Sequence, residues 1–212
     1  MRLRGCDGMP GADEMKAVLP GIWQWSWYSE EKKLDFNGLF LHVGEHKILV
    51  DPPPMTTEAR VFIQRQGPVD YILVTNRDHV REAAAYQPEF RCQLYVPAAD
   101  APQMEVTPTK TFVDGELLPG GIWVVQLKDQ KSPGESAFYI QQGKGVLIVG
   151  DAVIGNPVGS LTLLPPEKYL DVGQAREGLR RLLKYTFDSI LVGDGASIVG
   201  GAKNALAQTL QA

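Results

Sequence analysis

The chain has 212 residues, of which 44% are hydrophobic and 22% are charged, and its formal net charge is −4. This length suffices for one large domain or two small ones with a buried core, and the composition is ordinary for a soluble globular protein. An acidic balance without a basic stripe gives no support for a nucleic-acid partner. No apolar run approaches the ~20 residues of a membrane span.

The first residues resemble a flexible leader more than a signal peptide. Residues 1–15 are rich in glycine and lack the apolar core of a signal peptide, so we predict a leader over 1–15 and a single domain over 16–212. Cys6 and Cys92 have no metal-ligand spacing and are expected to be free thiols in a reducing cytoplasm. The expected location is therefore cytoplasmic. The sequence does not specify the oligomeric state, and a homodimer is compatible with it.

The first half of the chain changes its pattern after about 50 residues. The alternation of Trp23, Trp25 and Trp27 predicts a strand with three indoles on one face, and strands over 36–43 and 47–50 complete an antiparallel meander. The following pattern predicts helices over 56–66 and 79–86, strands over 70–75 and 91–96, and a short helix or turn over 97–104.

The second half repeats this order. Strands are expected over 110–113, 122–127, 137–141 and 146–149, followed by a long loop over 153–166. An amphipathic helix is expected over 167–185, with Leu170 and Ala175 on its apolar face, then a strand over 189–192 and a helix over 201–210. Two similar halves of this kind predict an α/β fold of four αββα layers, with two mixed sheets face to face and helices outside.

Four short apolar runs end at or just before an aspartate: Asp51, Asp78, Asp151 and Asp194. The carboxyl ends of parallel strands meet at one edge of a sheet, where open α/β sheets bind ligands. Carboxylates brought so close repel one another and must acquire protons, hydrogen-bond donors, a cationic side chain or a metal ion. A functional site is therefore expected at this edge.

The order of these pieces resembles the metallo-beta-lactamase superfamily over nearly the whole chain after the leader. Residues 36–41 and 47–51 are similar to its first hairpin and aspartate, and residues 71–80 to the segment that carries His-x-His-x-Asp-His. Residues 131–134, Lys-Ser-Pro-Gly, resemble its His-Thr-Pro-Gly turn. Residues 147–151 and 191–195 resemble the strand before the bridging aspartate and the closing Gly-His-Gly turn.

Departures from the family pattern remove one metal site. Val74, Asn76 and Lys131 stand where the resemblance implies three histidines of the first site, and neither valine nor an ammonium can ligate a metal. The second site is better preserved, and the resemblance implies the metal ligands Asp78, His79, Asp151 and Asp194. So many oxygen ligands favour manganese, iron or magnesium, although zinc can still compete. At most one divalent ion is expected, and a metal-free site is an open alternative.

Lys131 and Asp78 are the candidate catalytic residues. The hypothesis for Lys131 is that its ammonium occupies the lost first site and replaces the charge of the missing ion beside Asp151. Simpler roles remain open: Asp78 as a helix N-cap, Lys131 as a solvated surface lysine, Asp194 as a turn residue, and Asp51 as a structural turn anchor. Arg77 could neutralise the carboxylates or point outward.

These residues leave three functional hypotheses. The first is a hydrolase with one metal ion that acts on an unknown ester, thioester, lactone or phosphoester, with residues 28–35 and 153–166 walling the substrate. The second is a catalytically inactive, metal-free member of the fold that binds a small molecule or a protein. The third is a magnesium phosphatase of the haloacid dehalogenase type, because Asp51, Thr75, Lys131 and Asp151 occur in that order. Pro53 stands where that type needs a second acid.

Overall fold

The first of two sheets is built from seven strands in chain order, as the computed structural model of the protein shows for residues 14–211. The predicted leader, residues 1–15, lies almost wholly outside the described residues, as does Cys6. The first four strands pair antiparallel, and the remaining pairs are parallel. The strands are β1 (Lys16–Leu19), β2 (Ile22–Ser29), β3 (Leu34–Val43), β4 (His46–Val50), β5 (Tyr71–Leu73), β6 (Gln93–Pro97) and β7 (Lys110–Phe112).

The second sheet has six strands in the order β13-β12-β11-β10-β9-β8, and only its β11–β12 pair is parallel. Its strands are β8 (Leu117–Leu118), β9 (Ile122–Gln126), β10 (Ser136–Ile140), β11 (Val146–Val149), β12 (Ser189–Val192) and β13 (Ile198–Val199). β8 and β13 were not predicted, because a strand of two residues is too short to show an alternating pattern.

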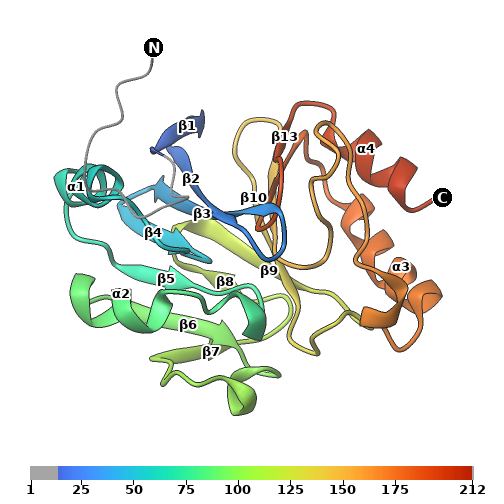
Figure 1. The fold of residues 1–212 in the computed structure, drawn as a ribbon, viewed down its shortest axis with the longest axis horizontal. Coiled ribbons are helices and arrows are strands. Elements are labelled where there is room, and N and C mark those ends of the chain that lie inside the picture. Colours follow the sequence, from blue (N-terminus) through green and yellow to red (C-terminus); the bar gives the residue numbers. More distant parts are fainter. Residues whose placement is uncertain (1–13, 212) are drawn as a thin grey trace.

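Helices cover the outer face of each sheet, which confirms the predicted αββα layers (Figure 1). α1 (Thr57–Arg65) and α2 (Ala83–Phe90) cover the first sheet, and α3 (Val172–Arg180) and α4 (Ala202–Thr209) cover the second. Short 3-10 turns lie at η1 (Arg77–His79), η2 (Ala101–Gln103), η3 (Pro119–Gly121), η4 (Pro166–Lys168) and η5 (Arg181–Lys184). Among residues 14–211, none of the helices combines the length and apolar character that a membrane crossing requires.

Apolar side chains from both sheets interdigitate to form the central core. Leu41 and Ile48 of the first sheet, and Phe138 and Ile148 of the second, belong to the same buried cluster. Trp25, in the middle of the predicted indole stripe, lies instead on the outer face of the first sheet, beneath α1. Trp23 packs against the same cluster as Trp25, so two of the three indoles are part of the core packing, whereas Trp27 contacts Phe36.

Two predicted helices begin later than the sequence pattern indicated. The helix expected over 79–86 begins at Ala83, because Arg81 has a left-handed backbone (φ 44°) that interrupts the turn after His79. The helix expected over 167–185 begins at Val172, where the Asp171 side chain accepts hydrogen bonds from the N–H groups of residues 173 and 174. Leu170, predicted on its apolar face, is fully exposed before that cap.

Strand register explains why the aspartates gather at one edge. Val50 pairs with Leu73 in the parallel β4–β5 ladder, and Val149 pairs with Val192 in the parallel β11–β12 ladder. Asp51 therefore follows its strand at the level of the 74–79 loop, and Asp151 and Asp194 each stand two residues beyond paired strand ends. Hydrogen bonds from Asn37 N to Gly193 O (2.7 Å) and from Ser136 N to Thr75 O (3.0 Å) connect the two sheets here.

Candidate functional site

Asp51 anchors the loop that follows β5. Its side chain is buried, and its Oδ1 accepts a hydrogen bond from Thr75 N (2.8 Å). Its Oδ2 accepts from Thr75 Oγ1 (2.6 Å) and from His79 Nδ1 (2.9 Å). Because a carboxylate only accepts, His79 must donate from Nδ1. Asp51 therefore orients the imidazole with Nε2 directed into the site, and it serves as the anchor that the sequence favoured.

Asn76 has a structural role at a position where the resemblance implies a ligand. Its Oδ1 accepts a hydrogen bond from Asp78 N (2.8 Å), so Asn76 caps the 77–79 turn and the N-cap role considered for Asp78 is wrong. Its Nδ2 donates to Glu135 Oε2 (2.7 Å), and Glu135 Oε1 accepts from Ala152 N (3.2 Å). Burial raises the pKa of the Glu135 carboxyl well above its usual range. Glu135, which was not predicted as a site residue, thus joins the loop after β5 to the loop after β11.

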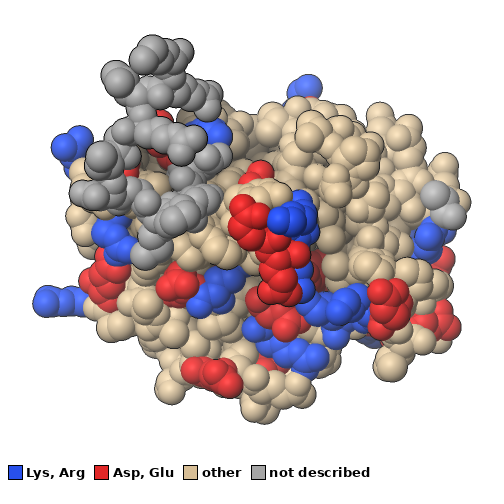
Figure 2. Space-filling view, in the orientation of Figure 1, with Lys and Arg blue, Asp and Glu red and all other residues tan. Residues whose placement is uncertain are grey.

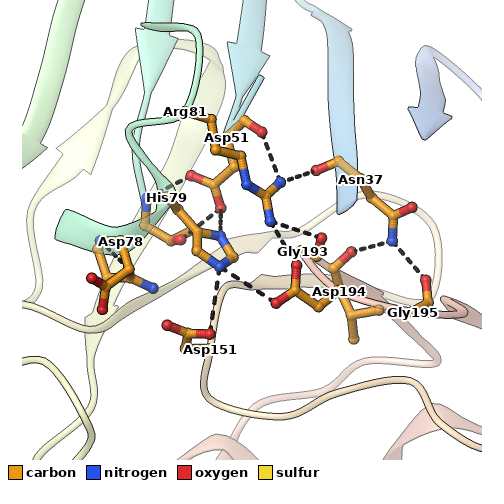
Figure 3. Close-up of polar contacts among 12 residues, drawn as sticks. Asn37, Asp51, Asp78, His79, Arg81, Asp151, Gly193, Asp194 and Gly195 are labelled. Atoms are coloured by element: carbon orange, nitrogen blue, oxygen red, sulfur yellow. Dashed lines mark hydrogen bonds and ion pairs between the residues drawn. The ribbon is translucent and has the colours of Figure 1, made fainter. Parts of the chain in front are cut away.

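His79, Asp151 and Asp194 point toward one another (Figure 3). One ligand atom from each lies within 4.8 Å of the other two. The His79 Nε2 atom is 3.6 Å from Asp151 Oδ1 and 3.9 Å from Asp194 Oδ2, which is too long for direct hydrogen bonds. Asp78 lies to one side and is outside this group. The structure therefore brings together three of the four predicted ligands.

Lys131 reaches into the site between two of the predicted residues. Its Nζ lies 2.8 Å from Asp151 Oδ2 and 2.9 Å from Asp78 Oδ2, and its side chain is 29% exposed. The turn that carries Lys131 is fixed by the buried Asp100, which accepts from Ser132 Oγ and from Gly134 N (2.8 Å). Two carboxylates therefore fix the position of the Lys131 ammonium, which is not a solvated surface lysine.

Arg81 is a site residue that the sequence analysis missed. Its Nη2 lies 2.6 Å from Asp194 Oδ1, and its Nη1 donates to the carbonyl oxygens of Asn37 (2.7 Å) and Asp51 (3.1 Å). The guanidinium also stacks over the Phe36 ring at 4.8 Å. Arg77, considered for this neutralising role, instead donates to Gln103 in an exposed position. Nothing in the local sequence distinguishes Arg81 from a surface arginine.

The electrostatics of the site are dominated by burial and by these opposite charges. Burial and Arg81 lower the pKa of His79, but Asp51 and Asp151 outweigh both and raise it to about 10. Burial raises the pKa of Asp151, yet His79 and Lys131 hold it well below its usual range. For Asp194, burial outweighs the neighbouring cations and raises its pKa.

The site opens into a cleft of about 510 Å³, a size typical of small-molecule sites. Residues of the β2–β3 hairpin (Lys32, Leu34 and Phe36) and of the 153–168 segment (Ile154, Leu164, Pro165 and Lys168) line it together with the polar site residues. Basic and acidic side chains gather near this hairpin on the face shown in Figure 2. The two segments predicted to wall the substrate, residues 28–35 and 153–166, thus both contribute residues to the lining of the cleft.

Comparison with known proteins relates the chain to one superfamily. The structure is similar to the crystal structure of DIM-1 metallo-beta-lactamase (TM-score 0.75, 16% identity, covering 94% of this chain and 97% of that chain). It is also similar to a metallo-beta-lactamase from Pontibacter korlensis (0.75, 18%, 93% and 98%) and to FIM-1 from Pseudomonas aeruginosa in its mono-zinc form (0.71, 16%, 95% and 97%). Identities this low show the fold alone.

No curated protein matches the chain. A family model described as the metallo-beta-lactamase superfamily, however, matches residues 15–212. Together with the two face-to-face sheets, this match excludes the haloacid dehalogenase alternative. The chain belongs to the metallo-beta-lactamase superfamily.

Proposed function

We propose that this protein is a hydrolase that uses one divalent metal ion, held by His79, Asp151 and Asp194. One observation carries the proposal. Each of the three side chains binds a protein partner through one polar atom and directs its other polar atom to a common point. The partner atoms are His79 Nδ1 with Asp51, Asp151 Oδ2 with Lys131, and Asp194 Oδ1 with Arg81.

The spacing of the free ligand atoms fits a metal ion. Ligands at about 2.0–2.2 Å from a zinc ion lie roughly 3–4 Å from one another, and the distances from His79 Nε2 to the two carboxylates are 3.6 and 3.9 Å. A second carboxylate that orients a ligating histidine is a usual feature of metal sites, and Asp51 supplies it. The donor set of two carboxylates and one imidazole suits manganese, iron or zinc. Because the pKa of His79 is about 10 without an ion, metal binding would release the proton from Nε2.

When bound, the ion would supply the Lewis acidity needed to hydrolyse an ester, thioester, lactone or phosphoester at neutral pH. Lys131 would place a positive charge in the cleft, where it can stabilise the negative charge that develops on a substrate oxygen. Asp78, whose side chain is 41% exposed, would hold the Lys131 ammonium in that position rather than ligate the ion. Lys131 is thus the proposed catalytic cation, with Asp78 as its partner in the cleft.

A second candidate function is a metal-free binding module. It is favoured by the cations that already accompany the carboxylates: Lys131 beside Asp151 and Arg81 beside Asp194. In such a protein the cleft would bind a small molecule without hydrolysing it.

Elemental analysis of untagged protein tests the metal proposal. We expect close to one equivalent of manganese, iron or zinc in the parent, and less than about a tenth of that in Asp151→Asn, because a ligand and its charge are lost. Asp78→Asn is the matched control and should retain the metal. A parent without metal after supplementation with all three ions would contradict the proposal and favour the binding module.

Replacing Lys131 with methionine is expected to lower the free energy of unfolding by about 1–2 kcal/mol, since charge-assisted hydrogen bonds to two carboxylates are lost at a partly exposed position. Metal affinity should rise, because a positive charge leaves the neighbourhood of Asp151. Urea denaturation and metal competition titrations measure the two effects. Lys144→Met, whose ammonium is 3.5 Å from Asp188 on the surface, is the control. If neither quantity changes, the Lys131 ammonium does not balance the charge of Asp151.

A further inference from the structure

Some of the charged side chains that line the cleft have a partner of opposite charge in the lining, and others do not. Its three acidic side chains all have cationic partners at the floor of the site: Asp78 and Asp151 contact Lys131, and Asp194 contacts Arg81. Two further basic side chains, Lys32 and Lys168, also line the cleft. The lining therefore carries positive charge that its own carboxylates do not offset.

Lys32 and Lys168 are both available to a ligand. No salt bridge joins Lys168 to an acidic side chain anywhere in residues 14–211. Lys32 pairs only with its neighbour Glu31, and the two side chains are 61% and 81% exposed. Exposed ion pairs of this kind contribute little to stability, so either side chain can readily take another partner. An anionic group entering the cleft would thus meet the Lys168 ammonium and the Lys32 ammonium, whose exposed pair with Glu31 it can replace.

An apolar surface lies in the same cleft. Phe36, Ile154 and Leu164 line it and remain half-buried, although they flank a strongly polar site. Small-molecule sites combine such apolar walls with a few charged groups that fix orientation. A ligand that matches this surface needs an aliphatic part as well as a charge.

We infer that the cleft selects an amphipathic anion, with an aliphatic portion against Phe36, Ile154 and Leu164 and a carboxylate or phosphate at Lys32 and Lys168. This inference rests on the proposed function in one respect: the cleft is the one that opens onto His79, Asp151 and Asp194. The substrate of the hydrolase would then be an ester, thioester or lactone whose acyl or alkyl chain carries an additional anionic group, or a phosphoester with an aliphatic chain.

Calorimetric titration of metal-free protein, prepared with a chelator, tests the inference without depending on the metal. The probes are hexanoate, hexyl phosphate and the neutral hexan-1-ol. We expect one binding site, at which at least one anion binds about tenfold more tightly than the alcohol. The tighter anion then identifies the carboxylate or the phosphate class. Equal affinity for the alcohol and both anions would overturn the inference.

The variant Lys32→Met/Lys168→Met identifies the responsible charges. It should lose about tenfold in affinity for the preferred anion and keep its affinity for hexan-1-ol. Lys33→Met is the matched control, because Lys33 lies in the same hairpin and pairs with Glu30 but does not line the cleft. Unchanged anion binding in the double variant would overturn the assignment. Because these titrations use metal-free protein, their failure leaves the metal proposal standing, and absence of metal leaves these titrations valid.

Discussion

Replacing Asp51 with alanine is expected to lower the free energy of unfolding by about 3–5 kcal/mol. The substitution removes a buried carboxylate that accepts three hydrogen bonds, and it leaves Thr75 N, Thr75 Oγ1 and His79 Nδ1 without acceptors. Residue 51 also has a left-handed backbone (φ 46°), which alanine adopts less readily than aspartate. Urea denaturation, followed by the fluorescence of the tryptophans, measures the loss.

Asp171→Ala is a matched control for Asp51→Ala, since Asp171 also accepts hydrogen bonds from two backbone N–H groups but lies on the surface at the start of α3. It should cost about 1 kcal/mol, as N-caps usually do. A loss for Asp51→Ala no greater than that of the control would show that the buried network contributes little.

The variant Asp51→Asn tests the effect of Asp51 on metal affinity while most of its packing is kept. The asparagine keeps the shape of the side chain, so most of the packing remains. If its amide NH₂ replaces Oδ2, however, it donates toward His79 Nδ1, and the imidazole then places its proton on Nε2, the atom that faces the metal site. We therefore expect metal affinity to fall about 10–100-fold, as for other losses of a partner that orients a metal-ligating histidine. Metal competition titrations of the variant and the parent give this ratio.

The fold could be predicted from the sequence because the patterns that indicate its strands are local. Apolar runs that end at Asp51, Asp151 and Asp194 mark parallel strand ends, and strand register then brings those ends to one edge. The start of α3 was predicted too early, at residue 167, although Asp171 is a good N-cap and Pro165 and Pro166 precede it.

The partners of the carboxylates were harder to predict, because long-range contacts determine them. Arg81 and Asp194 are 113 positions apart in the chain, and Asn76 and Glu135 are 59 apart. No periodicity links such pairs. Lys131 was found only because it stands in a turn that resembles a known motif, whereas Arg81 lies in no motif that was recognised.

Replacing Arg81 with methionine should have an effect as large as that of Asp51→Ala, about 3–5 kcal/mol in the free energy of unfolding. The Arg81 side chain is only 8% exposed, and removal of its guanidinium leaves the buried Asp194 carboxylate without its 2.6 Å partner. The carbonyl oxygens of Asn37, Asp51 and Gly193 also lose a donor. Urea denaturation in the presence of a chelator measures this loss.

Arg60→Met is the control, because Arg60 also pairs with a carboxylate (Glu89) and lies over an aromatic ring (Tyr86), but at a partly exposed position. Its loss should be near 1 kcal/mol. The double variant Arg81→Met/Asp194→Asn should recover part of the stability, since the uncompensated charge is then gone. A loss of under about 1 kcal/mol for Arg81→Met would show that Asp194 does not need this cation.

The response of Arg81→Met to metal distinguishes the two candidate functions. In a metal site, an added divalent ion supplies the positive charge that Asp194 has lost, so saturating manganese or zinc should stabilise Arg81→Met more than it stabilises the parent. In a metal-free binding module, the ions should stabilise neither protein. The same denaturation curves, recorded with and without metal, therefore show whether Arg81 accompanies a metal ion at Asp194 or takes its place.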